Sequence, residues 1–133
     1  MELRTDEALA EALAQVREQR ADMERVQAKW PDAYVSDTHW QRYDARIEAL
    51  RWVLGQSNTS PVTRTPTTGR PTVEDISRER QAAYNLRFPG HKRDDQPAGF
   101  PNWLWVEHLE VTLGWSISAT NQVGEPELHP ARF

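Results

Sequence analysis

The chain has 133 residues, of which 38% are apolar, and a mean hydropathy of −0.80, which allows one domain with a modest core. The absence of cysteine excludes disulfides, thiolate zinc sites, iron–sulfur clusters and cysteine nucleophiles. The net charge of −4 disfavours nucleic acid and anionic membranes as partners, and no apolar run reaches the roughly 20 residues that a membrane span needs. We therefore expect a cytoplasmic protein.

Residues 6–29 predict one long amphipathic helix, because their apolar side chains recur at intervals of three, four or seven. Thr5 or Asp6 can cap its start. Arg20 interrupts the apolar stripe, and Pro31 should end the helix. The stripe consists of Leu9, Leu13, Val16, Met23 and Val26.

A second helix is expected to begin at Ser36 or Asp37 and to end before Gly55, a typical C-terminal cap. Its apolar residues alternate three and four apart, as in a coiled-coil seam. Together the two helices predict an antiparallel hairpin over residues 1–55. Since one hairpin alone cannot bury both seams, we expect it to drive self-association. The expected interface residues are Trp40, Tyr43, Ile47, Leu50 and Leu54.

Residues 56–72 are rich in Ser, Thr and Pro and contain one apolar residue, Val62. Little there offsets the entropy of ordering the chain, so we expect a linker or an extended arm. It is either a plain spacer or a phosphorylation or docking segment. After it, Thr72 can cap a shorter helix with acidic residues in its first turn, which Pro89 should end.

From Trp103 onwards, apolar residues occupy odd positions and polar residues even ones, an alternation typical of a strand. Val, Thr, Ile and Trp are enriched there, and Gly114 in mid-run suits a bent strand or hairpin. Residues 102–113 also fit a helical face, with Asn102 as the cap. We favour the strand.

The predicted fold class is therefore α+β. It comprises a helical hairpin over residues 1–55, a linker over 56–72, and a short helix with a small antiparallel β unit over 73–133.

Tryptophan is over-represented, with 6 Trp against 3 Tyr and 3 Phe. One explanation is a core that has few other large apolar residues. The other is a binding surface, since Trp is enriched in interface hot spots. Such a surface would draw on some of Trp30, Trp40, Trp103, Trp105 and Trp115, facing a partner or a second copy. Of these, we expect Trp103, Trp105 and Trp115 to face an unidentified protein partner.

Two short clusters could carry chemistry. His91, Asp94 and Asp95 lie in a turn-rich loop and could bind a divalent metal or act in acid–base catalysis, although their basic neighbours equally suit a solvated charge run. His108 and Glu110 would share one face of a strand and could ligate a metal. Since no nucleophile elbow, phosphate loop or metal motif is present, we expect no catalytic residues, no metal and no cofactor.

The stretch Arg42–Gly55 (RYDARIEALRWVLG), followed by the Ser/Thr/Pro-rich segment, resembles small uncharacterised proteins of high-GC actinobacteria and their phages. The resemblance carries over no functional residue. It implies an accessory or phage-encoded protein.

The functional hypothesis is a non-enzymatic, homo-oligomeric protein–protein interaction module that acts as a phage or mobile-element inhibitor or adaptor of a host protein. The first alternative is a structural protein of virion assembly, with residues 56–72 as an arm reaching a neighbouring subunit. The second is a metal-dependent hydrolase that uses His91, Asp94 and Asp95.

Overall fold

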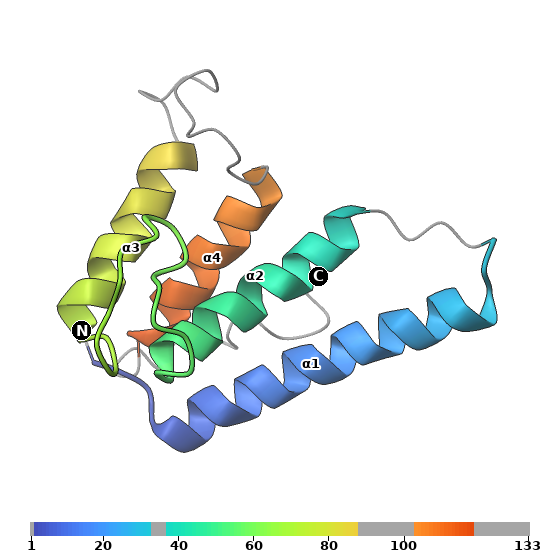
Figure 1. Ribbon diagram of the computed structural model, residues 1–133, viewed down its shortest axis with the longest axis horizontal. Helices are drawn as coiled ribbons and strands as arrows, with labels where there is room; N and C mark the ends of the chain where they lie inside the picture. Colours follow the sequence, from blue (N-terminus) through green and yellow to red (C-terminus); the bar gives the residue numbers. More distant parts are fainter. Residues whose placement is uncertain (1, 33–36, 88–102, 119–133) are drawn as a thin grey trace.

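The computed structural model describes residues 2–32, 37–87 and 103–118 of the chain. This described part contains four helices (Figure 1). Helix α4 packs between α3 and α2, and α2 in turn packs against α1, with which it runs antiparallel (Figure 1). The helices are α1 (Asp6–Lys29), α2 (Asp37–Val53), α3 (Val73–Arg87) and α4 (Trp103–Ser116).

The predicted β unit, and with it the α+β class, is wrong, because residues Trp103–Ser116 form a helix. The described residues contain no strand, only the isolated bridges Glu2–Ser118 and Thr59–Pro66. Three of the even-numbered polar residues that suggested a solvent-facing side, Glu110, Thr112 and Ser116, are themselves buried. Thr112 and Ser116 are fully buried, and the Ser116 hydroxyl donates to the Thr112 carbonyl at 2.9 Å, a bond between residues one helical turn apart.

This error has a physical cause. A helix that is covered on several sides carries apolar residues all round, so its sequence shows no polar face at a period of 3.6. Apolar residues that happen to fall on odd positions then imitate a half-exposed strand.

The helix ends agree with the caps expected from the sequence. Thr5 Oγ1 accepts from the Ala8 backbone N–H at 3.1 Å and caps α1. Gly55 follows α2 with a φ of +79°, a left-handed conformation that glycine adopts at low cost. Thr72 and Asp75 exchange side-chain to backbone hydrogen bonds of 3.0 and 3.1 Å, which form a capping box at the start of α3.

The core lies where α2 and α4 meet the first half of α1 and the inner face of α3. Removing these side chains from water supplies the main force that holds the helices together. Its buried members include Leu9, Leu13 and Val16 of α1, Ala45, Ala49, Leu50, Trp52 and Val53 of α2, Ile76 and Ala83 of α3, and Val106, Leu109 and Leu113 of α4.

Segment 56–72, expected as a linker or an extended arm, forms a loop that lies beside α2 and α3 (green in Figure 1). Ser60 and Val62 are buried. Arg70 joins the loop to the start of α1, because its Nη1 lies 2.6 Å from Asp6 Oδ1. Arg64 pairs with Glu48 of α2 at 2.7 Å.

The first residues of the chain close over the end of α4. Arg4 Nε donates to the Trp115 carbonyl at 2.6 Å, where a cation suits the negative end of the helix dipole. The Arg4 guanidinium also lies 4.4 Å from the centre of the Trp115 ring. None of the helices in the described ranges combines the length and apolar content that crossing a membrane requires.

Gly114 offers a direct test of the helical assignment for α4. In a helix interior, replacing Gly with Ala gains roughly 0.5–1 kcal/mol. A Cβ at Gly114 would come within 2.9 Å of the Arg80 side chain, so the comparison is made in an Arg80→Ala background. There we expect Gly114→Ala to raise the free energy of unfolding in urea by about that amount. A loss of stability would contradict a helical backbone at Gly114.

Candidate functional site

The second half of α1 extends beyond the core. The buried residues of α1 all lie in its first half, from Leu9 to Val16. Further along, Met23 is half-buried, whereas Val26 is 44% and Trp30 is 59% exposed. We call residues 17–29 of α1 and its C-cap Trp30, with residues 40–44 of α2, the hairpin tip.

A polar layer joins the two helices of the hairpin tip. Arg20 Nε lies 2.6 Å from Asp44 Oδ1 of α2, and its guanidinium lies 5.1 Å from the centre of the Trp40 ring. Arg20 also pairs with Glu24 on its own helix. The hydrogen bond to Asp44 raises the pKa of Arg20 above its usual value. The residue that interrupts the apolar stripe in the sequence is therefore the one that links α1 to α2 here.

Val26 and Trp30 are large hydrophobic side chains left exposed next to one another. In the described part of the chain, Tyr84 of α3 is the other large hydrophobic residue with this degree of exposure. Trp30 is the C-cap residue of α1, and Lys29 Nζ lies 5.8 Å from the centre of its ring. Because Val26 and Trp30 are four residues apart, they lie on one face of the helix.

The residues expected at a helical interface serve largely in this chain's own packing. Leu50 is fully buried, and Tyr43, Ile47 and Leu54 are half-buried against the core. Trp40 is half-buried beside Arg20.

The tryptophans expected at the partner surface are placed differently from one another. Trp105 is half-buried against the core, and Trp115 is 7% exposed beside Arg4. The side chain of Trp103 lies outside the described part.

Sequence reasoning placed Val26 on the stripe of α1 but did not single it out. Trp30 is among the tryptophans considered for a partner surface, and its position just before Pro31, after the last turn of a charged helix, agrees with its exposed ring.

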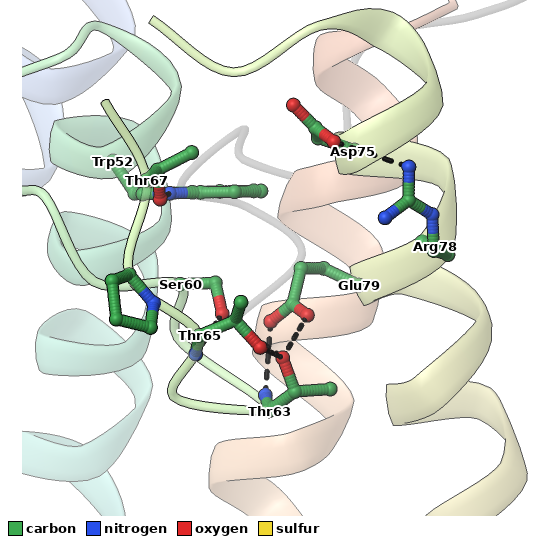
Figure 2. A pocket seen from close by; sticks show the side chains of 9 residues that line it. Trp52, Ser60, Thr63, Thr65, Thr67, Asp75, Arg78 and Glu79 are labelled. Carbon is green, nitrogen blue, oxygen red and sulfur yellow. Dashed lines mark hydrogen bonds and ion pairs between the residues drawn. The ribbon is translucent and has the colours of Figure 1, made fainter. Parts of the chain in front are cut away.

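A pocket of about 230 Å³ lies between α2, segment 56–72 and α3 (Figure 2). Trp52 of α2 forms one wall, and charged side chains of α3 form another. Hydroxyl groups of the loop supply most of the remaining lining. The lining residues are Trp52, Ser60, Thr63, Thr65, Pro66, Thr67, Asp75, Arg78 and Glu79.

Glu79 attaches the loop to α3. It is 5% exposed, and its Oε1 accepts the backbone N–H groups of Val62 and Thr63 at 2.8 and 3.0 Å. Its Oε2 accepts the Thr63 hydroxyl at 2.5 Å (Figure 2). One carboxylate thus satisfies three donors of a turn that has few apolar contacts. These bonds offset part of the conformational entropy that is lost when the segment becomes ordered. The composition of the segment, which has few apolar residues, does not reveal this contribution.

The same carboxylate fixes the direction of the hydroxyl network. Since Thr63 gives its proton to Glu79, its Oγ1 must accept from Ser60 Oγ at 3.0 Å and from Thr65 Oγ1 at 2.7 Å. On the other side of the pocket, Trp52 Nε1 donates to Thr67 Oγ1 at 2.8 Å. The lining groups are therefore held in defined donor and acceptor states.

Asp75 and Arg78 lie at the edge of the pocket, with Arg78 Nη2 3.2 Å from Asp75 Oδ1. The backbone N–H of Thr72 donates to Asp75, and together with the Thr72 hydroxyl and Arg78 it lowers the pKa of this carboxyl group. Asp75 thus both caps α3 and balances the charge of Arg78.

A second polar group lies inside the core, where α2 meets α4. Arg46 is fully buried and donates from Nε and Nη2 to His108 Nδ1, at 3.2 and 2.8 Å. Removal from water lowers the pKa of Arg46 to about 9. Because Nδ1 accepts, the proton of the neutral imidazole is on Nε2. Nothing in the sequence distinguished Arg46 from the other arginines of α2.

The structure bears differently on the two short clusters that were considered as candidate metal ligands. His108 and Glu110 are about 200° apart around α4, so the shared face expected on a strand is lost. No group of three potential ligands gathers among the residues the structure describes. His91, Asp94 and Asp95 lie outside those residues.

Comparisons with known proteins give no relative. No family model, no curated protein and no solved structure matches the chain.

Replacing Glu79 tests its role as the anchor of the loop. Glu79→Ala leaves the N–H groups of Val62 and Thr63 without their acceptor, so we expect a loss of about 1–3 kcal/mol in the free energy of unfolding. Faster hydrogen exchange at the Val62 amide should accompany it. Glu74→Ala, which removes an exposed carboxylate from the same helix, should cost less than about 1 kcal/mol. Equal losses for the two variants would contradict the anchoring role.

The lowered pKa of Asp75 predicts that part of the free energy of unfolding depends on pH. Its folded-state pKa is lowered, so the stabilisation is fully present above the ordinary Asp value of about 3.9. It disappears as the pH falls through the lowered pKa. Wild type should therefore be more stable than Asp75→Asn at neutral pH, and the difference should shrink on acidification below about pH 4. Urea unfolding at several pH values measures this, and a difference independent of pH would disprove it.

Proposed function

We propose that the protein acts by binding other protein chains rather than by catalysis, and that its hairpin tip associates with the tip of a second copy. The exposure of Val26 and Trp30 beside each other on α1 is the observation that carries this proposal. Trp is costly to leave in water and is among the residues that contribute most to interfaces.

The spacing of these side chains suits a partner helix. Met23, Val26 and Trp30 follow one another at intervals of three and four, which aligns them along one face of α1. The first half of the same helix uses this spacing to pack on the chain's own core, with Leu9, Leu13 and Val16. A second helix laid along the tip would continue that mode of packing.

The charges of the tip favour a second copy over a strongly charged partner. Residues 17–29 contain four basic and three acidic side chains, a balance of +1, whereas the whole chain carries −4. Several of these charges pair within the helix, among them Arg25 with Asp22 and Glu18. Two copies that meet here avoid the repulsion between the more acidic remainders of the chains.

The finer role, inhibition or adaptation of a host protein in a phage setting, stays a prediction. Self-association through the tip would leave the surfaces of α3 and of segment 56–72 accessible in each copy.

Sedimentation velocity over about a hundredfold range of protein concentration tests the association. We expect the wild-type mass to rise from one chain to two. The double variant Val26→Ser/Trp30→Ser should weaken the dimer about thirtyfold, since a hot-spot side chain contributes roughly 2 kcal/mol. Because both side chains are exposed, its unfolding free energy should change by no more than about 0.5 kcal/mol.

Tyr84→Ser, which removes an exposed aromatic ring from α3, is the matched control. It should leave the dimer unchanged. A wild-type protein that stays a single chain at every concentration would overturn the proposal, as would equal effects of the tip variant and the control.

A further inference from the structure

We propose that the pocket between α2, segment 56–72 and α3 binds a small neutral polyhydroxyl compound, of the size of a monosaccharide. This site is separate from the hairpin tip, and the inference does not depend on self-association. Figure 2 shows the side chains of Trp52, Thr67, Asp75, Arg78 and Glu79 around one space.

The volume limits the size of the ligand. At about 230 Å³, the pocket is smaller than the roughly 300–1,000 Å³ of sites for drug-sized molecules. Its rim reaches the surface, since the Arg78 side chain is 76% exposed and Thr65 is also exposed. A compound of about ten heavy atoms could therefore enter without unfolding the loop.

The charges select a neutral ligand. Asp75 is balanced by Arg78 at 3.2 Å, and Glu79 accepts three hydrogen bonds from the loop. An anion would meet two carboxylates against one guanidinium. A cation would have to compete with Arg78 for Asp75. The carboxylate without a counter-charge, Glu79, is held by its three hydrogen bonds to the loop and is 5% exposed, so it offers little to a cation.

The hydrogen-bonding groups suit hydroxyls. Thr67 Oγ1 accepts from Trp52 Nε1 and keeps its own proton to donate, whereas Thr65 gives its proton to Thr63 and so offers lone pairs. Arg78 has further N–H donors besides the one directed at Asp75. A hydroxyl both donates and accepts from one atom, so neighbouring hydroxyls on one ligand can satisfy this mixed lining.

Trp52 closes one side of the site, since it is 1% exposed and its indole is held in place through Nε1. Pro66, an exposed residue of the lining, supplies the apolar surface. The C–H groups of a sugar or cyclic polyol can pack on this ring while the hydroxyls face the polar groups of the loop and α3. Since Glu79 already fixes the loop, little ordering is required on binding.

Titration followed by ¹H–¹⁵N NMR tests the proposal. The probes are D-glucose, D-ribose and myo-inositol, with inorganic phosphate and putrescine as charged comparisons. The reporters are the backbone amide of Thr65 and the indole N–H of Trp52, which Trp52→Phe assigns. We expect at least one neutral probe to shift both signals saturably, with a Kd of about 1 mM, and the charged probes to leave them unmoved.

Matched variants identify the site. Thr67→Val removes the donor from the pocket, whereas Thr68→Val makes the same change at an exposed neighbour that does not line it. With Thr65 as reporter, we expect Thr67→Val to weaken binding about fivefold and Thr68→Val to leave it unchanged. Arg78→Met, at a largely exposed side chain, should also weaken binding and serves if Thr67→Val does not fold.

Three results would overturn the proposal. The first is the absence of a saturable shift with all three neutral probes. The second is a response to phosphate or putrescine instead. The third is an equal affinity for the lining variants and Thr68→Val.

Discussion

The burial of α4 between α2 and α3 is the constraint on which the rest of the structure depends. Leu109 and Leu113 occupy the common interior, and the fully buried Trp52 and Leu50 of α2 belong to the same core. In the described part, α2 and α3 are joined mainly through α4. The loop over the pocket and the hairpin are therefore both positioned by a helix that follows them in the chain. Arg4 adds to this arrangement by binding the carboxyl end of the same helix.

The sequence predicts an element well where it has one apolar and one polar face. The spans of α1 and α2 follow from such periodicity, and the residue types at the helix ends predict the cap at Thr5, the turn at Gly55 and the capping box at Thr72 and Asp75. The same reasoning fails for α4, because a helix buried on several sides has no polar face to reveal its period. Burial of Thr112 and Ser116 is a property of the tertiary fold, and composition does not report it.

The two candidate sites show a different limit of sequence reasoning. Segment 56–72 has the composition of a spacer, yet Glu79 lies outside that window and supplies the acceptors that hold its turn. Likewise, Arg20 interrupts the stripe of α1 because its partner, Asp44, is on the next helix. In both cases the structure depends on a contact between residues that are far apart in the chain. Local sequence patterns do not reveal such contacts. The expected interface residue Leu50 shows the converse, since a seam typical of self-association is occupied within one chain.

The late position of α4 has a consequence for how the chain is made. As the ribosome synthesises the protein from its N-terminus, α1 and α2 emerge first and can pair, but the apolar side of α2 that later receives α4 stays uncovered until residue 116 has left the exit tunnel. During that interval the apolar side chains of this face of α2 are exposed to water and to neighbouring nascent chains. A fragment released by a ribosome that stalls before α4 would lack one side of the core. Its exposed apolar surface would make it prone to aggregation.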